Sequence, residues 1–182
     1  MKYILLFEKF EKMRWELITS NPEKKINGKR LIDIVKNAYK TTKLGSMVKT
    51  MKDVLKSYWY VININSDKDI DACLFYRKHR KEENWKGFKI QGLGHDGDHK
   101  SKKLIIKKLV DILNNQKGYW CEASDILESI LNAKGVKKIT DEKTLKRLFP
   151  NSKIVLLKDG QYKRTLNDGQ WITETVFGDP NF

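Results

Sequence analysis

The sequence predicts an α/β (α+β) fold, a single domain in which helices flank a mixed, mostly antiparallel central sheet. Three observations lead to this class. Residues 58–64 and 70–76 are rich in aromatic and β-branched side chains, which favour neighbouring antiparallel strands. Residues 85–113 join a short apolar strand to an amphipathic helix through a loop with glycines. A further short strand follows that helix, so one helical crossover is expected within the sheet.

The length and composition fit one well-buried domain. The chain has 182 residues, of which 40% are hydrophobic and 10% aromatic, and this composition excludes a disordered chain. No segment rich in proline, serine or glycine marks a linker. We therefore expect one domain over residues 1–182, with an N-terminal extension at 1–25, a core at 26–166 and a C-terminal tail at 167–182.

The first third of the chain is expected to be mainly helical. Residues 2–18 fit either a strand followed by a helix or one helix, and Asn21-Pro22 ends this segment. Apolar residues three and four apart predict a helix from Ile26 to about Lys40. A second, short helix is expected at 48–55.

The central third carries three strands and the crossover helix. A polar turn at 65–69 joins the two aromatic-rich strands, and a charged loop at 78–84 leads to a third strand at 87–93. A helix then begins near Lys100, with its apolar residues on one face. The aromatic residues 58–60 are interpreted as core, with base stacking as the weaker alternative.

The last third alternates short helices and strands. Gly118 ends the crossover helix before a strand at 119–122, and a helix that begins at Ala123 or Ser124 stops at Gly135. Thr140 is expected to cap a helix at 141–148. The remaining expected elements are a hairpin, 154–157 with 162–166, and a final strand, 171–177.

The loop between the third strand and the crossover helix is the expected ligand site. A strand end that leads into a helix N-terminus collects free backbone N–H groups and the positive end of the helix dipole, so it attracts anions. Three lysines near the start of the helix add positive charge. A phosphate-bearing cofactor is therefore expected here. The residues expected to hold it are Leu93, Gly94, His95, Gly97, His99, Lys100, Ser101, Lys102 and Lys103.

The order of elements resembles the GNAT acyltransferase superfamily over about residues 26–166. The loop of that family has the sequence Gln/Arg-x-x-Gly-x-Gly/Ala, followed by an apolar pair. We take Leu104-Ile105 as that pair. Asp96, His99 and Ser101 then occupy the three signature positions, and none of them carries the family residue. The glycines of this chain lie earlier.

A second motif lies at the end of the helix that follows residues 119–122. The segment SILNAKGVKKI is similar to the family's Leu-Tyr-x-x-x-Gly-Phe sequence, with Gly135-Val136 in the place of Gly-Phe. Leu131 stands where the family has a tyrosine, which is often the acid for the departing thiolate. Ser124 falls on a commonly found asparagine. The resemblance thus covers the scaffold but lacks the usual acid.

The resemblance implies transfer of an acyl group, typically acetyl, from acyl-coenzyme A (acetyl-CoA) to an amine. The loop would bind the pyrophosphate, and the strand near residues 93–95 would pair with the pantetheine arm. The amine would attack the thioester directly, so catalysis would rest on positioning and on a base that takes the ammonium proton. The loop would supply this base, and a hairpin tyrosine would replace the missing acid. The candidate catalytic residues are His95, Asp96, Glu122, Ser124 and Tyr162.

Three alternatives for the same loop stay open. Gly92, Gly94 and Gly97 form a Gly-x-Gly-x-x-Gly pattern, and Glu122 lies about where a ribose-binding acid would be expected, but too few residues follow for a dinucleotide-binding sheet. Residues 95–99 bring two histidines and two aspartates together, as metal ligands would be, although neighbouring loop residues seldom converge on one ion. The third alternative is that these polar side chains only cap the helix.

The basic charge favours polyanionic partners. The chain has 37 Lys+Arg against 23 Asp+Glu, a net charge of +14. Nucleic acid is therefore expected as a partner beside acyl-CoA, either as the acceptor substrate or as the ligand of a non-enzymatic, nucleic-acid-associated or assembly protein that keeps the fold. Alternatively, the scattered lysines serve only solubility. The enzyme is the leading hypothesis.

The cysteines and apolar runs favour a cytoplasmic protein. Cys73 and Cys121 are far apart and form no CxxC motif, which favours a reduced compartment. The apolar run near the N-terminus is too short for a signal peptide, and no run approaches the length of a membrane span. Cys121 as a nucleophile is a weaker alternative, because no histidine neighbours it in sequence.

Overall fold

The computed structural model describes residues 14–18, 28–40, 59–64, 69–78, 87–123 and 125–180. They belong to two compact units: unit 1 comprises Met1–Arg77 and Gln91–Lys107, and unit 2 comprises Lys78–Ile90 and Lys108–Phe182. Strand β4 (Phe88–His95) and helix α4 (His99–Asn115) each have residues in both units.

Strands β1 (Arg14–Ile18), β2 (Trp59–Ile64) and β3 (Ile70–Lys78) of unit 1 are antiparallel neighbours. Strand β1 pairs with β2, and β2 pairs with β3. The second part of β4 follows β3 in the strand order. The two aromatic-rich strands are thus confirmed. The helical interpretation of residues 14–18 is wrong, because their backbone pairs with β2, a partner that local sequence does not reveal.

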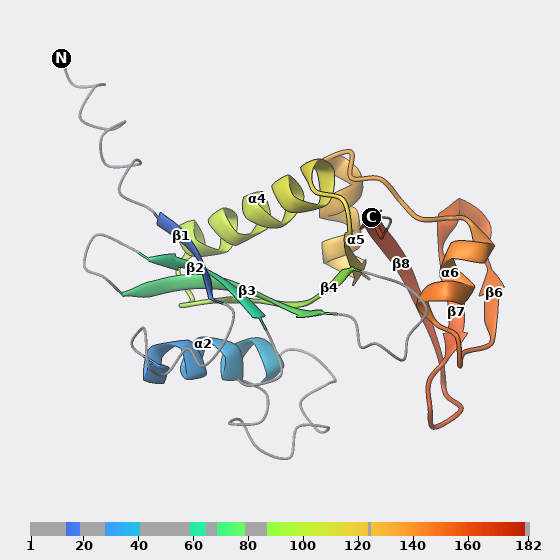
Figure 1. The fold of residues 1–182 in the computed structure, drawn as a ribbon, viewed down its shortest axis with the longest axis horizontal. Helices are drawn as coiled ribbons and strands as arrows, with labels where there is room; N and C mark the ends of the chain where they lie inside the picture. Colours follow the sequence, from blue (N-terminus) through green and yellow to red (C-terminus); the bar gives the residue numbers. More distant parts are fainter. Residues whose placement is uncertain are drawn as a thin grey trace. The chain divides into compact units, whose positions relative to one another are not determined.

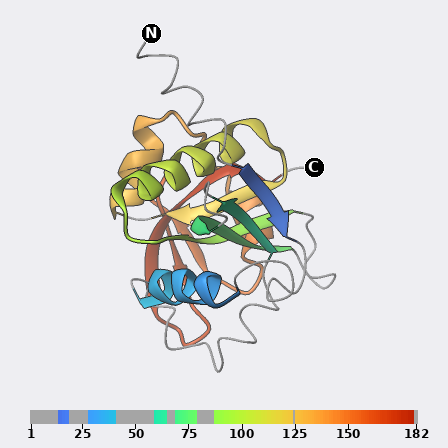
Figure 2. The same ribbon diagram turned by 90° about the vertical axis from the view of Figure 1, so that its left-hand side faces the viewer.

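Helix α2 (Gly28–Lys40) confirms the helix expected from residue 26 to 40. It packs on one side of β2 and β3, and the start of α4 lies on the other side (Figures 1 and 2). Tyr60 is 1% exposed, which confirms that it is a core residue. The buried residues of this cluster are Leu31, Ile34, Val35, Tyr60, Ile62, Ile70, Cys73 and Phe75.

Unit 2 contains a parallel pair of strands. The start of β4 pairs in parallel with β5 (Tyr119–Ala123), and α4 connects them, so the predicted crossover is confirmed. Beyond β5 the order is β8 (Trp171–Asp179), β7 (Tyr162–Thr165) and β6 (Ile154–Leu156), all antiparallel. The predicted hairpin is therefore β6–β7, and the last segment, β8, lies between β5 and β7.

Helices α5 (Asp125–Ala133) and α6 (Glu142–Leu148) complete unit 2. Thr140 is not the cap of α6: Asp141 Oδ2 accepts a hydrogen bond from Thr144 N at 2.7 Å, the bond that an N-cap residue makes. Gly135 has φ +67, as expected of the residue after a helix end. The buried residues of this core are Trp120, Ile139, Leu145, Leu148, Phe149, Tyr162 and Val176.

The α/β class with a mixed, mostly antiparallel sheet is thus confirmed. Residues 2–13 of the N-terminal segment, the expected helix at 48–55, most of the turn at 65–69, most of the charged loop at 78–84, and Ser124 lie outside the described residues. The domain limits at 25 and 166 stay a prediction. Among the described helices, none has the length and apolar character needed to cross a membrane.

Candidate functional site

The expected ligand loop lies in unit 1, between β4 and α4. His95 ends β4 and His99 begins α4, close to the predicted helix start. The backbone of Asp96 is still bonded to the sheet, because its N–H donates to the backbone oxygen of Asp71 in β3 at 2.9 Å. The nine expected cofactor residues differ in burial: Gly94 and Ser101 are buried, Leu93 and His95 are half-buried, and Gly97, His99, Lys100, Lys102 and Lys103 are exposed.

Side chains of the loop accept hydrogen bonds from the loop's own backbone. Gly97 N donates to Nδ1 of His95 at 3.0 Å, and Asp98 N donates to Oδ1 of Asp96 at 2.9 Å. Lys100 N donates to Oδ2 of Asp98 at 3.0 Å, so Asp98 acts as the N-cap of α4. Three N–H groups at the expected phosphate site are therefore engaged, and the capping interpretation is confirmed for Asp98.

Gly92 and Gly94 lie inside β4 and are required for packing. A Cβ atom on Gly94 would lie 2.6 Å from Ile34 Cγ2, and one on Gly92 would lie 2.1 Å from the Phe75 ring. Gly97 is in the loop, with φ +103 and no atom within 4 Å of the position that a Cβ would take. Two of the three glycines in the Gly-x-Gly-x-x-Gly pattern thus have a structural reason that requires no dinucleotide.

The start of α4 keeps a positive surface. Lys100, Lys102 and Lys103 are exposed, while Ser101 and Ile105 on the same helix are buried. Lysine side chains bind phosphate as point charges, without the directional fit that backbone N–H groups give. The residues present therefore fit an anionic group through side-chain charge rather than through the three engaged loop amides.

The side chain of Asp96 lies close to Arg30 of α2. Its Oδ2 lies 3.8 Å from Nη2 of Arg30, and its side chain is 17% exposed. Nε of Arg30 also donates to Ile70 O at 3.4 Å, which ties α2 to β3. A base role for His95 or Asp96 stays a prediction. Among the described residues, no three His, Cys, Asp or Glu side chains gather as metal ligands would.

Glu122 and Tyr162, two of the expected catalytic residues, lie together in unit 2. Oε1 of Glu122 accepts hydrogen bonds from Tyr162 OH at 3.2 Å and from Arg164 Nε at 3.0 Å. Lys89 Nζ donates to Oε2 of the same carboxylate. Arg164 Nη2 lies 3.2 Å from Oε2 of Glu174. We call these five side chains, from β4, β5, β7 and β8, the Glu122 cluster.

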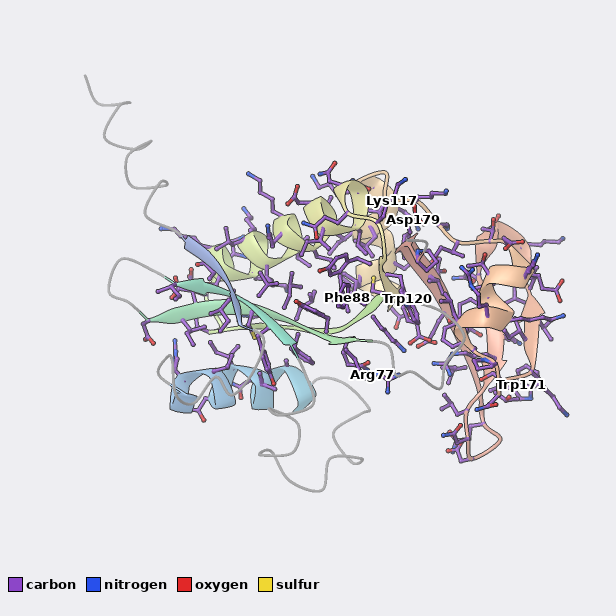
Figure 3. The ribbon with its side chains drawn as sticks, viewed as in Figure 1. Arg77, Phe88, Lys117, Trp120, Trp171 and Asp179 are labelled. Carbon is purple, nitrogen blue, oxygen red and sulfur yellow. The ribbon has the colours of Figure 1, made fainter. Side chains whose placement is uncertain are left out.

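The Glu122 cluster is enclosed by aromatic rings. The side chain of Glu122 is 11% exposed and that of Arg164 is 13% exposed. Lys89 Nζ lies 5.1 Å from the centre of the Trp120 ring, and Arg164 Cζ lies 4.6 Å from that of Phe149. Trp120 belongs to β5, next to Phe88 and the start of β4 (Figure 3). Charges held this far from water perturb one another strongly.

The two carboxyl groups of the cluster titrate in different ranges. Burial alone would raise the pKa of Glu122, but attraction to Lys89 and Arg164 outweighs burial and lowers this pKa to about 2. Burial and the neighbouring Glu122 carboxylate raise the pKa of Glu174 to about 7. Burial, with both carboxylates, also raises the pKa of the Tyr162 phenol. Glu174 is therefore matched to proton transfer near neutral pH, whereas Tyr162 holds its proton more tightly than an ordinary tyrosine.

Replacement of Glu174 by glutamine should flatten the pH dependence of stability. A carboxyl whose pKa is higher in the folded state stabilises the fold below its unfolded pKa, here 4.5, and this contribution is lost as pH rises through about 7. The unfolding free energy of the wild type should therefore fall by about 1–3 kcal/mol between about pH 5 and pH 8. Glutamine keeps the hydrogen-bonding shape without titrating. Urea unfolding across this range measures the difference.

The matched control for this experiment is Glu142→Gln. Glu142 is an exposed glutamate of α6 that pairs with Lys146 at 2.7 Å. Its replacement should leave the pH dependence as in the wild type. An equal slope in the wild type and in Glu174→Gln would contradict the shifted pKa of Glu174.

Sequence reasoning found two members of the Glu122 cluster and missed three. Lys89, Arg164 and Glu174 were not expected to take part. A signal was present, because Glu174 interrupts the apolar face of β8 between Ile172 and Val176. A charged residue at a core position of a strand indicates a buried partner.

The environment of Cys121 disfavours the thiolate, which is the nucleophilic form of cysteine. Burial, followed by the negative charge of Glu122, raises the pKa of its thiol to about 12. A buried thiol with a raised pKa is unreactive at neutral pH. The weaker alternative of a cysteine nucleophile is thus disfavoured by the structure.

Comparison with known proteins identifies no family for this chain and one weak structural similarity. No protein-family profile and no curated protein matches the sequence. Among solved structures, the chain is similar to a protein from Acinetobacter baylyi ADP1 that is provisionally named an acetyltransferase. The TM-score is 0.43 and the identity 7%, over 91% of this chain and 90% of the other. Any functional proposal therefore rests on the residues of this chain.

Proposed function

We propose that the chain is an acyltransferase that moves an acyl group from acyl-coenzyme A to an amine. The observation that carries this proposal is the β4–α4–β5 unit. It is a parallel pair with a helical crossover beside antiparallel strands, which is the element order of the GNAT resemblance. The parallel ladder covers only three residue pairs and ends at Ile90 and Cys121, although β4 continues to His95.

In this proposal the start of α4 holds the phosphates of the cofactor. Lys100, Lys102 and Lys103 supply the charge, and the backbone of Leu93 to His95 pairs with the pantetheine arm. When bound, the cofactor supplies an activated thioester. The chain then has to orient the amine and accept its proton. His95 and Asp96 are the groups of the loop that can accept a proton.

Titration calorimetry with acetyl-CoA tests the proposal. We expect micromolar binding, with desulfo-coenzyme A bound comparably and NAD bound weakly. The double replacement Lys100→Ala and Lys102→Ala should weaken binding by about tenfold or more, because it removes two charged contacts to phosphate. Absence of binding to both coenzyme A compounds would reject the acyltransferase.

A single replacement in the loop sharpens this test. Asp98→Asn keeps an N-cap side chain and removes a negative charge from the phosphate site, so acetyl-CoA binding should strengthen. Asp111→Asn is the control, because Asp111 is exposed on the same helix, about 20 Å farther along its axis. Equal changes in both variants would indicate an effect of net charge alone and no phosphate site at this loop.

One set of observations favours a second function, a non-enzymatic nucleic-acid-associated protein with this fold. The loop amides of Gly97, Asp98 and Lys100 donate to the loop's own side chains. Leu131, in the position of the family's tyrosine, is completely buried. If the wild-type chain binds nucleic acid but does not bind acetyl-CoA, this second function is favoured.

A further inference from the structure

The outer face of the β6–β7–β8 sheet in unit 2 is open and carries an exposed tryptophan on β8, with exposed lysines on the same side of the sheet at β7 and just before β6. The strand registers place Val155, Lys163 and Thr173 in one row across the three strands. Trp171 pairs with Thr165, whose hydroxyl accepts a hydrogen bond from Lys153 N at 2.9 Å. We call this surface the Trp171 face. Its residues are Lys153, Val155, Lys163, Thr165, Trp171 and Thr173.

The opposite side of the same strands is already used for the core. Tyr162 and Val176 are buried there beneath α6, with Ile154 packed against them. Farther along the outer side, Thr175 is buried and its hydroxyl donates to Glu128 of α5 at 2.9 Å. Helix α5 therefore covers one end of the outer side, and the Trp171 face is what remains open in the described part of unit 2.

The Trp171 face exposes apolar surface that water disfavours. The indole of Trp171 is 50% exposed and Val155 is 49% exposed. Trp171 lies at the outer end of β8, opposite the end that carries Asp179 (Figure 3). A half-exposed tryptophan on a sheet surface has an accessible ring face, to which a flat partner can bind.

The charges of the Trp171 face are all positive. Lys153 and Lys163 are exposed, and none of its six residues is acidic. The side chains of Glu174 and Glu122 belong to the other side of the sheet, where they bind Arg164. Beside the face, exposed Lys158 is followed by exposed Asp159 in the connection between β6 and β7, and exposed Asp168 lies in the turn before Trp171. The positive charge of the face therefore comes from Lys153 and Lys163.

We propose that the Trp171 face binds single-stranded nucleic acid, with one base stacked on the indole and the neighbouring phosphates near Lys153 and Lys163. An aromatic side chain and adjacent cations on an open sheet are what an unpaired base and its backbone require. A duplex offers no free base face to the ring, and the face has no protruding helix to enter a groove. This proposal does not depend on acyl transfer.

Fluorescence anisotropy of the full chain with a labelled oligothymidylate of about twelve nucleotides tests the proposal. Trp171→Ala should weaken binding about 5- to 100-fold, and Trp171→Phe should keep most of it, because phenylalanine retains a stacking surface. Lys153→Ala and Lys163→Ala should each lower the slope of log affinity against log salt by about 0.7. A duplex of the same length should bind more weakly and should not respond to Trp171→Ala.

Two controls use exposed residues away from the Trp171 face. Ile126→Ala removes an apolar side chain of α5 that is 77% exposed, and Lys134→Ala removes an exposed charge. Ile126→Ala should leave the affinity unchanged. In the Lys134→Ala background, Trp171→Ala should weaken binding by the same factor as in the wild type. Thermal unfolding of each variant verifies that it is folded. Equal affinity of the wild type and Trp171→Ala, or no binding of the oligonucleotide by the wild type, would overturn the proposal.

Discussion

Replacement of Glu122 by glutamine should lower the unfolding free energy by about 3–5 kcal/mol. The carboxylate accepts hydrogen bonds from Lys89, Tyr162 and Arg164 and is 11% exposed. Glutamine has nearly the same shape but no charge. Two buried cations would then face only Glu174. Its pKa falls when the Glu122 charge that helps to raise it is removed, so Glu174 is ionised but balances only one of the two cations. Breaking a buried pair in this way is costly because the remaining charge has lost both water and its partner.

Chemical denaturation near neutral pH measures this effect, with Glu142→Gln as the matched control. Glu142 also pairs with a lysine, but its side chain is 52% exposed and that of Lys146 is 63% exposed. An exposed pair on a helix contributes about 0.5 kcal/mol or less. The same substitution should therefore have a small effect in α6 and a large one in β5. Similar losses in the two variants would show that water screens the Glu122 cluster.

Replacement of Gly178 by alanine should destabilise the fold by about 3 kcal/mol or more. A Cβ atom there would lie 2.3 Å from the backbone oxygen of Tyr119 and 2.9 Å from Cδ2 of Leu113. The residue also has φ +111, a backbone conformation that residues other than glycine rarely adopt. Strand β5 would have to move, because the nearest atom belongs to its backbone.

Gly169→Ala separates the clash from the backbone conformation. Gly169 has φ +82, but no atom lies within 4 Å of the position of its Cβ. This variant should lose only about 1–2 kcal/mol, the cost of a left-handed residue. Thermal unfolding of the two variants gives the comparison. Equal losses would mean that β5 and β8 separate more easily than their close approach indicates.

Local sequence patterns predicted the helices and strands of this fold better than they predicted which strands pair with one another. The period of apolar residues predicted α2 and the crossover helix α4, because each helix buries one face. Pairing partners are non-local, so the pattern of residues 171–177 did not reveal that β8 lies between β5 and β7. For the same reason residues 14–18 were open to a helical interpretation. Their partner is β2, whose paired residues lie 42 to 50 positions farther along the chain.

The candidate site was predictable where a residue type has one strong local role. Asp98 precedes a helix, and an N-cap was among the interpretations of the loop. Gly92 and Gly94 were misleading, because a glycine is equally required by a loop and by the close approach of Ile34 or Phe75. Glu122 and Tyr162 were expected separately. Only the strand order brings them together with Arg164.

Each unit contains one buried cysteine, whose reaction with a thiol reagent can report how often that unit opens. Cys73 belongs to unit 1 and Cys121 to unit 2, and burial raises the pKa of each thiol to about 12. A thiol reagent can modify such a group only when the surrounding structure opens. The labelling rate of each cysteine, measured with the other replaced by alanine, therefore reports the opening free energy of its own unit. Equal rates would mean that the chain opens as a whole, and unequal rates would identify the unit that opens first.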